Sequence, residues 1–189
     1  MKELPKQYPI DIQGLKRQLH VFKVSDDLAI AAFIILGDVE ACSFCANLLA
    51  EQIPQVDVLI TAEAKGIPLV HELSRVLGIP RYVVARKSKK TYMEEPLSVD
   101  VDSITTLEQQ KLYLPREDLY LIQGKRVGIV DDVISTGESL NSLEELVDQA
   151  GGHVVCKAAV LAEGNASNRD DIIFLEKLPL FHSDQYDFG

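Results

Sequence analysis

Two adjacent carboxylates and a hydroxyl-rich turn stand together in the segment from Val127 to Ser139. The apolar residues Val127–Val130 predict a buried strand, and Asp131 and Asp132 follow at its end, where we expect both side chains to face solvent. Ionised carboxylates accept hydrogen bonds, so this pair suits the two neighbouring hydroxyls of a ribose. The turn leads into a helical pattern, and a helix N-terminus offers free N–H groups and a partial positive charge to a phosphate. The segment therefore predicts a site for a phosphorylated sugar.

The turn itself carries groups that suit an anion. Hydroxyl donors come from Ser135, Thr136 and Ser139. Gly137 lets the backbone approach an anion closely, whereas the carboxylate of Glu138 must point away from a phosphate or repel it. No Gly-Lys-Ser/Thr follows, so the turn is not a P-loop. Acidic residues near a helix start also occur for electrostatic reasons alone. The Asp-Asp pair by itself is therefore as consistent with a structural role as with a binding role.

Two further segments carry positive charge after predicted strands. Glu63-Ala64-Lys65-Gly66 follows one strand, and Arg86-Lys87-Ser88-Lys89-Lys90 follows the next and holds four of the 19 basic residues. A diphosphate leaving group needs donors and positive charge where its own charge develops, which suits Lys65, Arg86 and Lys90. A basic run is usually a solvated loop, and its position directly after a core strand is what points to a site.

Repeated strand and helix patterns supply the scaffold for these segments. One strand–helix–strand unit covers Val56–Ala85, with Gly78 ending its helix, and a second covers Val127–Leu161. Leu28–Leu36 predicts a buried strand, the first of the chain, that leads into a helix stopped by Pro54. Repeated units of this kind predict an α/β fold with a parallel sheet flanked by helices.

The stretch Lys87–Gln123 differs from the rest because polar and apolar residues alternate in it, around Leu97–Ile104 and Lys111–Leu114. This pattern predicts a long antiparallel excursion from the sheet. No repeat or interdomain linker is visible, so we expect one domain over residues 1–189. The residues after Asn165 carry no clear pattern.

The charge balance of the chain argues against some classes of binding partner. The chain has 19 Lys and Arg residues against 29 Asp and Glu, a formal net charge of −10. Such a field repels nucleic acid and anionic lipid, and no apolar run reaches the ~20 residues of a membrane span. The N-terminus has no signal-peptide pattern and the cysteines number three, which is odd. We therefore expect a cytoplasmic protein with neither nucleic-acid nor membrane partners.

Two other patterns are weaker. Cys42-Ser43-Phe44-Cys45 has the spacing of a redox motif or a zinc half-site, but it lacks a second pair and lies on a helical apolar stripe. We interpret it as core packing. The histidines lack metal-ligand spacing, and we assign no metal ligand.

Taken together, the charged segments resemble the type I phosphoribosyltransferases. Val127–Ser139 is similar to that family's signature for phosphoribosyl pyrophosphate, Glu63–Ile67 looks like its pyrophosphate loop, and Arg86–Lys90 resembles the basic segment of the adenine and xanthine enzymes. The resemblance implies that Asp131, Asp132 and Arg86 act in catalysis, with the two acids on the ribose hydroxyls. It implies further substrate contacts from Ser135, Thr136, Gly137, Glu138 and Ser139 at the 5′-phosphate, and from Ala64, Lys65, Gly66, Lys87 and Lys90 at the diphosphate.

The same resemblance implies a purine phosphoribosyltransferase that joins a free base to phosphoribosyl pyrophosphate and releases pyrophosphate. Mg²⁺ would be bound mainly through the substrate, and residues 87–123 would form a flexible loop that closes over the reacting centre. The basic loop would reach a neighbouring subunit, which makes us expect a homodimer. A small hood from residues 1–36, with or without the tail, would cover the base.

The base itself is less defined. We expect adenine, with xanthine or hypoxanthine as the alternative, and Phe33 and Ile35 either enclose the base or only fill the core. A different class of function is a non-catalytic sensor of phosphoribosyl pyrophosphate, since some regulators keep this fold and motif. Such proteins usually carry a DNA-binding module, for which an acidic chain whose first strand begins by Leu28 leaves little room and the wrong charge.

Overall fold

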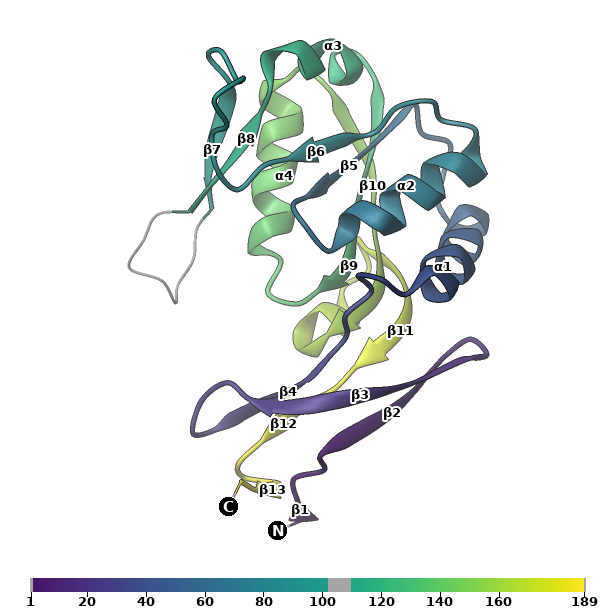
Figure 1. The fold of residues 1–189 in the computed structure, drawn as a ribbon, viewed down its shortest axis with the longest axis vertical. Coiled ribbons are helices and arrows are strands. Elements are labelled where there is room, and N and C mark those ends of the chain that lie inside the picture. Colours follow the sequence, from purple (N-terminus) through teal and green to yellow (C-terminus); the bar gives the residue numbers. More distant parts are fainter. Residues whose placement is uncertain (1, 102–109, 189) are drawn as a thin grey trace.

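The computed structural model describes residues 2–101 and 110–188. A larger α/β body carries a smaller antiparallel sheet that is built near both termini, at the lower end of the view in Figure 1. Among the described residues, no helix has the length and apolar character needed to cross a membrane.

The larger sheet contains five parallel strands in the order β11-β10-β9-β5-β6. These are β5 (Val58–Ala62), β6 (Val83–Ala85), β9 (Arg126–Ile134), β10 (His153–Glu163) and β11 (Ile173–Leu178). Every residue of β5 and most of β9 and β10 are buried, as expected for a parallel sheet that is covered on both faces. The predicted α/β class is confirmed, and β11 comes from the tail that showed no pattern.

Helices cover both faces of this sheet. One face carries α1 (Val39–Gln52) and α2 (Gly66–Leu77), which pack against each other. The other carries α4 (Glu138–Gln149) and the short α3 (Leu119–Ile122), which follows a 3-10 turn at Arg116–Asp118. The apolar core is therefore divided into two layers, one on each side of the sheet.

The helix ends follow the capping signals of the sequence. The Asp38 carboxylate accepts a 2.9 Å hydrogen bond from the N–H of Ala41 at the start of α1. Gly78 ends α2 with a φ of 70°, a left-handed conformation that glycine adopts without steric cost. Pro54 follows soon after α1, as predicted.

We call the smaller antiparallel sheet the hood. Its strands run in the order β12-β4-β3-β2, and are β2 (Gln7–Ile12), β3 (Leu15–Lys23), β4 (Leu28–Ala32) and β12 (Leu180–His182). A short parallel pair joins the termini, between β1 (Lys2–Glu3) and β13 (Tyr186–Asp187). The tail therefore completes the hood by supplying β12.

The prediction for Leu28–Leu36 is wrong in two respects. It is not the first strand, because β1, β2 and β3 precede it, and β4 pairs with β3 and β12 in the hood. The strand ends at Ala32, and its buried Ala29 and Ala31 alternate with half-buried neighbours. One face of an antiparallel sheet packs on the core while the other does not, which explains the alternation.

The predicted antiparallel excursion is confirmed as the hairpin of β7 (Leu97–Val101) and β8 (Gln110–Leu114). Its predicted extension to Ile104 lies outside the described residues. Buried residues of both strands pack on the α4 side of the core. Backbone hydrogen bonds of 2.8 Å in both directions between Arg86 and Tyr113 tie β8 to the end of β6.

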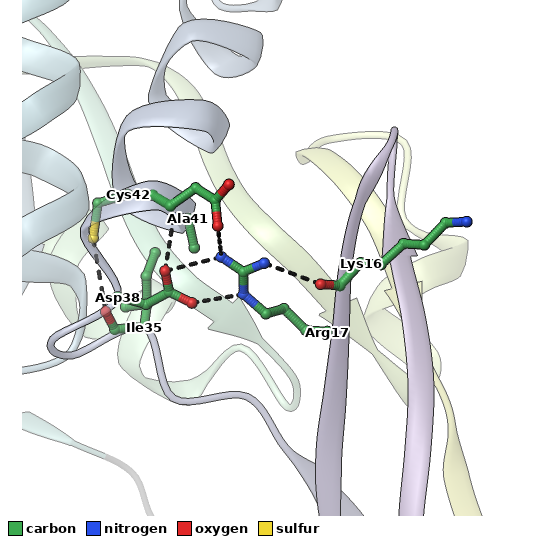
Figure 2. A network of polar contacts seen from close by, with 7 residues as sticks. Lys16, Arg17, Ile35, Asp38, Ala41 and Cys42 are labelled. Carbon is green, nitrogen blue, oxygen red and sulfur yellow. Dashed lines mark hydrogen bonds and ion pairs between the residues drawn. The ribbon is translucent and has the colours of Figure 1, made fainter.

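One ion pair fastens the hood to the α/β body. Arg17 of β3 donates from Nε and Nη2 to the two carboxylate oxygens of Asp38, at 2.7 and 3.0 Å (Figure 2). Its Nη2 also donates to Glu40 at 2.8 Å. Because Asp38 is the N-cap of α1, the guanidinium connects a hood strand directly to a helix of the body.

The cysteines pack as interpreted. Cys42, Cys45 and Cys156 are free and buried. Burial raises the pKa of the Cys45 thiol to about 12, so this group stays protonated and unreactive at neutral pH.

Candidate functional site

Asp131 and Asp132 lie inside β9 rather than at its end. β10 continues to pair beyond them, with Ala159 opposite Asp131 and the ladder reaching Ile134. On the other side, β5 pairs with β9 only as far as Ile129. The two acids therefore stand where β9 has lost its β5 partner, beside the turn that follows β5.

The two carboxylates occupy different environments. Asp132 is only 2% exposed, so the prediction that both side chains face solvent is wrong for this residue. Its Oδ2 lies 3.0 Å from Nζ of Lys65, which is an ion pair by distance although the angles do not meet those of a hydrogen bond. Opposite charges attract at this distance whatever the angle, so the Lys65 ammonium stabilises the buried Asp132 carboxylate. Asp131 is half-buried, and its Oδ1 accepts a 2.8 Å hydrogen bond from the Asp132 N–H.

The electrostatics of this pair are unfavourable without further donors. Burial raises the pKa of Asp131 well above its ordinary value of 3.8, and the neighbouring Asp132 carboxylate raises it further. The Lys65 ammonium opposes both effects but is the smaller influence. Two carboxylates that share one ammonium keep a net negative charge, and hydroxyl donors from a ligand would stabilise the ionised form of Asp131.

The turn after β9 has the geometry of an anion site. Gly137 has a φ of 85° and precedes α4, and no side chain of residues 2–101 or 110–188 caps this helix end. The N–H groups of the first helical turn are therefore available to a ligand. A cavity of about 70 Å³ is lined by all five predicted turn residues, Ser135, Thr136, Gly137, Glu138 and Ser139. Glu138 lines this cavity too, so its negative charge has to be balanced if an anion binds.

The predicted segments meet in a second, larger cavity of about 410 Å³. It is lined by groups from three separate parts of the chain, namely Ala64, Lys65, Lys87, Asp131, Asp132 and Ser139. Residues more than 60 positions apart are thus brought together at the carboxyl edge of the parallel sheet, where ligands bind in open α/β folds.

Gly66 allows this arrangement because there is no room for a side chain. A Cβ on Gly66 would overlap Oγ1 of Thr61 and lie 3.1 Å from Oδ1 of Asp131. The absence of a side chain lets the start of α2 approach β5 and the acidic pair closely. Lys65, the residue before it, is thereby held beside Asp132.

Arg86 and Lys90 stand apart from the larger cavity. Arg86 donates from Nε to Glu63 at 3.0 Å and from Nη1 to the hydroxyl of Tyr92 at 3.0 Å, and Glu63 also accepts from the Lys87 N–H at 2.9 Å. Lys90 donates to Ser88 at 2.6 Å in an exposed position. Neither basic side chain lines the cavity, so their predicted contacts with a diphosphate would require the segment after β6 to move.

Sequence reasoning missed Glu163 at the end of β10. It lines a cavity of about 220 Å³ between the hood and the body, together with Phe33, Lys65 and Ser135. Burial raises the pKa of Glu163, and Lys65 partly offsets that rise. Ile35 instead is fully buried in the core. The sequence does carry a signal for Glu163, because it is a charged residue at the carboxyl end of a predicted central strand.

The similarity of the chain to a known protein family agrees with the chemistry that the site suggests. Residues 42–183 match the family model described as the phosphoribosyl transferase domain. The chain belongs to the phosphoribosyltransferase family. The resemblance drawn from the three charged segments is therefore confirmed.

Individual relatives divide over the base. A protein from Methanocella arvoryzae named hypoxanthine/guanine phosphoribosyltransferase is 32% identical over 87% of this chain and 79% of its own length. A xanthine phosphoribosyltransferase from Brevibacillus brevis is 35% identical over 59% of this chain and 56% of its length. Among solved structures, adenine phosphoribosyltransferase from Thermoanaerobacter pseudethanolicus superposes with a TM-score of 0.70, covering 84% of this chain and 95% of that one, at 23% identity. That last likeness concerns the fold.

Proposed function

We propose that the chain is a purine phosphoribosyltransferase, which transfers the phosphoribosyl group of phosphoribosyl pyrophosphate to a purine nitrogen and releases pyrophosphate. The observation that carries the proposal is the 410 Å³ cavity, in which the acidic pair, Lys65, Lys87 and Ser139 meet. It adjoins the phosphate-sized cavity of the turn on one side, since Asp131 and Ser139 line both. It adjoins the hood cavity through Lys65.

Each cavity suits one part of the substrates. The turn after β9 binds the 5′-phosphate through backbone N–H groups and hydroxyls. Asp131 accepts hydrogen bonds from the ribose hydroxyls, and Lys65 and Lys87 attract the diphosphate. The hood cavity receives the base. The rate enhancement comes from positioning the two reactants and from stabilising the negative charge on the departing pyrophosphate. No protein nucleophile is therefore required.

Magnesium fits this site as a partner of the substrate. No group of three or more His, Cys, Asp or Glu side chains that could hold a metal is found in the described part of the chain. Mg²⁺ prefers oxygen ligands and keeps several of its waters, so substrate oxygens would supply most of its remaining ligands. When bound, it neutralises charge on the departing diphosphate.

We propose adenine as the base. The carboxylate of Glu163 accepts a hydrogen bond from an exocyclic amine, whereas the 6-oxo group of hypoxanthine or guanine needs a donor at the same place. Hypoxanthine, guanine or xanthine is the second candidate, because relatives at 32–35% identity carry these names. Phe33 lines the hood cavity and suits the flat face of either base.

We also propose a cytoplasmic homodimer. Free, buried thiols suit a reducing compartment. Ile34, Leu36 and Val39 are large apolar side chains that are 48–80% exposed around the start of α1, and a second copy would cover them. Light scattering on the purified protein tests the dimer.

The function is tested by pyrophosphate release from phosphoribosyl pyrophosphate and Mg²⁺, with adenine, hypoxanthine, guanine and xanthine supplied in turn. We expect turnover with adenine above the others. Turnover with a 6-oxopurine alone would mean that the base is a 6-oxopurine and not adenine. Tight binding of phosphoribosyl pyrophosphate without turnover for any base would favour a sensor.

A further inference from the structure

Arg169 lies against the turn that we assign to the 5′-phosphate. It follows the 3-10 helix Gly164–Asn168, in the connection between β10 and β11. Its Nη1 stands 2.7 Å from the position that a Cβ on Gly137 would take. Gly137 is buried and has a φ of 85°, and Nη1 takes up the space that a side chain at this position would need.

A chain of ion pairs holds this guanidinium in place. Arg169 donates from Nε and Nη2 to the two oxygens of Asp171, at 2.8 and 2.6 Å. Asp171 also accepts from Lys157 at 2.7 Å, and Lys157 in turn donates to Glu144 of α4 at 2.9 Å. Because α4 begins at the turn, the network fixes Arg169 relative to the same helix whose N-terminus would bind the phosphate.

The two ends of the Arg169 guanidinium differ in their partners among the described residues. Asp171 occupies Nε and Nη2, and no hydrogen bond from Nη1 to any of the described residues is formed. The unused nitrogen is the one that stands against Gly137. A bidentate pair on one edge therefore aims the remaining donors of Arg169 at the turn.

The charge at the turn explains why a cation is needed. Residues 134–141 contain no Lys or Arg and carry one charged side chain, Glu138. A phosphate monoester has a charge between −1.5 and −2 at neutral pH. Glu138 and the phosphate would repel each other, and helix N–H groups with their partial charge offset that only in part. The Arg169 guanidinium, which is paired with Asp171 on its other edge, brings positive charge against Gly137 of this turn.

We propose that Arg169 binds the 5′-phosphate of the substrate through Nη1 and compensates for Glu138. The proposal rests on the proposed function, because it takes the turn to be the 5′-phosphate site. Asp171 then acts as a positioning residue, which orients the guanidinium without contact with the substrate.

Calorimetric titration with ribose 5-phosphate and, separately, with pyrophosphate tests this proposal without requiring turnover. We compare the wild-type protein with Arg169→Gln and Arg169→Lys. Loss of a charged hydrogen bond predicts about tenfold or more weaker binding of ribose 5-phosphate to Arg169→Gln, with unchanged pyrophosphate binding and partial recovery in Arg169→Lys. Asp171→Asn should weaken ribose 5-phosphate binding to a smaller degree.

The matched control is Arg75→Gln, since Arg75 forms a similar bidentate pair with Glu72 on α2. It should bind both ligands as the wild type does. Equal binding of ribose 5-phosphate by wild type and Arg169→Gln would overturn the proposal, and so would an equal loss for both ligands, which indicates general damage. If the wild type binds ribose 5-phosphate but transfers no phosphoribosyl group from phosphoribosyl pyrophosphate to any base, the enzyme assignment fails while the role of Arg169 stands.

Discussion

Nζ of Lys65 lies 3.0 Å from Oδ2 of Asp132, so the turn before α2 is joined to β9 through a carboxylate that is almost fully buried. The lysine side chain is itself half exposed, at 49%. A buried carboxylate without a cation is costly, whereas a half-exposed ammonium can return to water. The pair is therefore asymmetric, and the two residues should respond differently to substitution.

Lys65→Met should destabilise the fold by about 1 kcal/mol, because Asp132 loses its cation and solvent screening limits the effect. Adding Asp132→Asn should recover most of that stability but not the activity. Urea unfolding of both single variants and the double variant measures the coupling. Strictly additive changes in the free energy of unfolding would contradict the ion pair.

Asp131→Asn with Asp132→Asn should abolish turnover, because the ribose hydroxyls lose their carboxylate acceptors, while the fold is kept. Full activity in this double variant would remove both acids from the mechanism. Thermal melting, run beside the pyrophosphate-release assay, checks that the variant is folded.

Asp131→Asn alone should show a stability gain that depends on pH. The folded pKa of Asp131 is raised, so the unfolded chain releases this proton first as pH rises. Wild-type stability is therefore lost between the ordinary value of 3.8 and the raised folded value, and the asparagine variant escapes that loss. Melting temperatures from pH 4 to pH 8 should diverge in favour of the variant as pH rises. A constant difference would mean that burial does not perturb this carboxyl.

Gly66→Ala should impair both stability and substrate binding, since the new Cβ would overlap Thr61 and press on Asp131. Gly78→Ala is the control at the far end of α2. It is strained by its φ of 70° but open around the new Cβ, so it should lose stability and keep its affinity for phosphoribosyl pyrophosphate. Adding Thr61→Ala to Gly66→Ala should restore part of the stability. No recovery would locate the damage elsewhere.

Local patterns predicted the parts of this structure that local physics determines. The strand–helix–strand units, the glycine end of α2 and the hydroxyl turn before α4 follow from periodicity and capping within a few residues. The burial of Asp132 was missed because a buried carboxylate needs a cation nearby. That cation is Lys65, which is distant in sequence and follows another strand, β5. The strands before Leu28 were missed because β2 and β3 alternate between more buried and more exposed residues and contain no long apolar run.

The hood attachment should depend on the Arg17–Asp38 pair. The Arg17 guanidinium holds the pKa of Asp38 below its ordinary value of 3.8, so the pair stabilises the fold above that value and the effect is lost as pH falls through the folded pKa. Asp38→Asn keeps an N-cap but loses the charge, and should cost about 1 kcal/mol at neutral pH and little in acid. It should also raise the KM for the base more than that for phosphoribosyl pyrophosphate.

Glu40→Gln is the matched control for that variant, because Glu40 contacts the same guanidinium from a side chain that is 75% exposed. Its effect on stability and on the KM for the base should be small. Equal effects of the two substitutions would show that total charge around Arg17, rather than the bidentate contact, holds the hood.

Glu163→Gln should reduce the discrimination between amino and oxo purines. The Glu163 carboxylate accepts hydrogen bonds, whereas a glutamine amide can accept from an exocyclic amine or donate to a 6-oxo group. The ratio of kcat/KM for adenine to that for hypoxanthine should therefore fall about tenfold, the size expected for one altered polar contact. Glu176→Gln on β11, a glutamate outside the hood cavity, is the control and should leave the ratio unchanged. An unchanged ratio in Glu163→Gln would mean that this carboxylate does not face the C6 substituent, and base selection would then have to come from the hood strands.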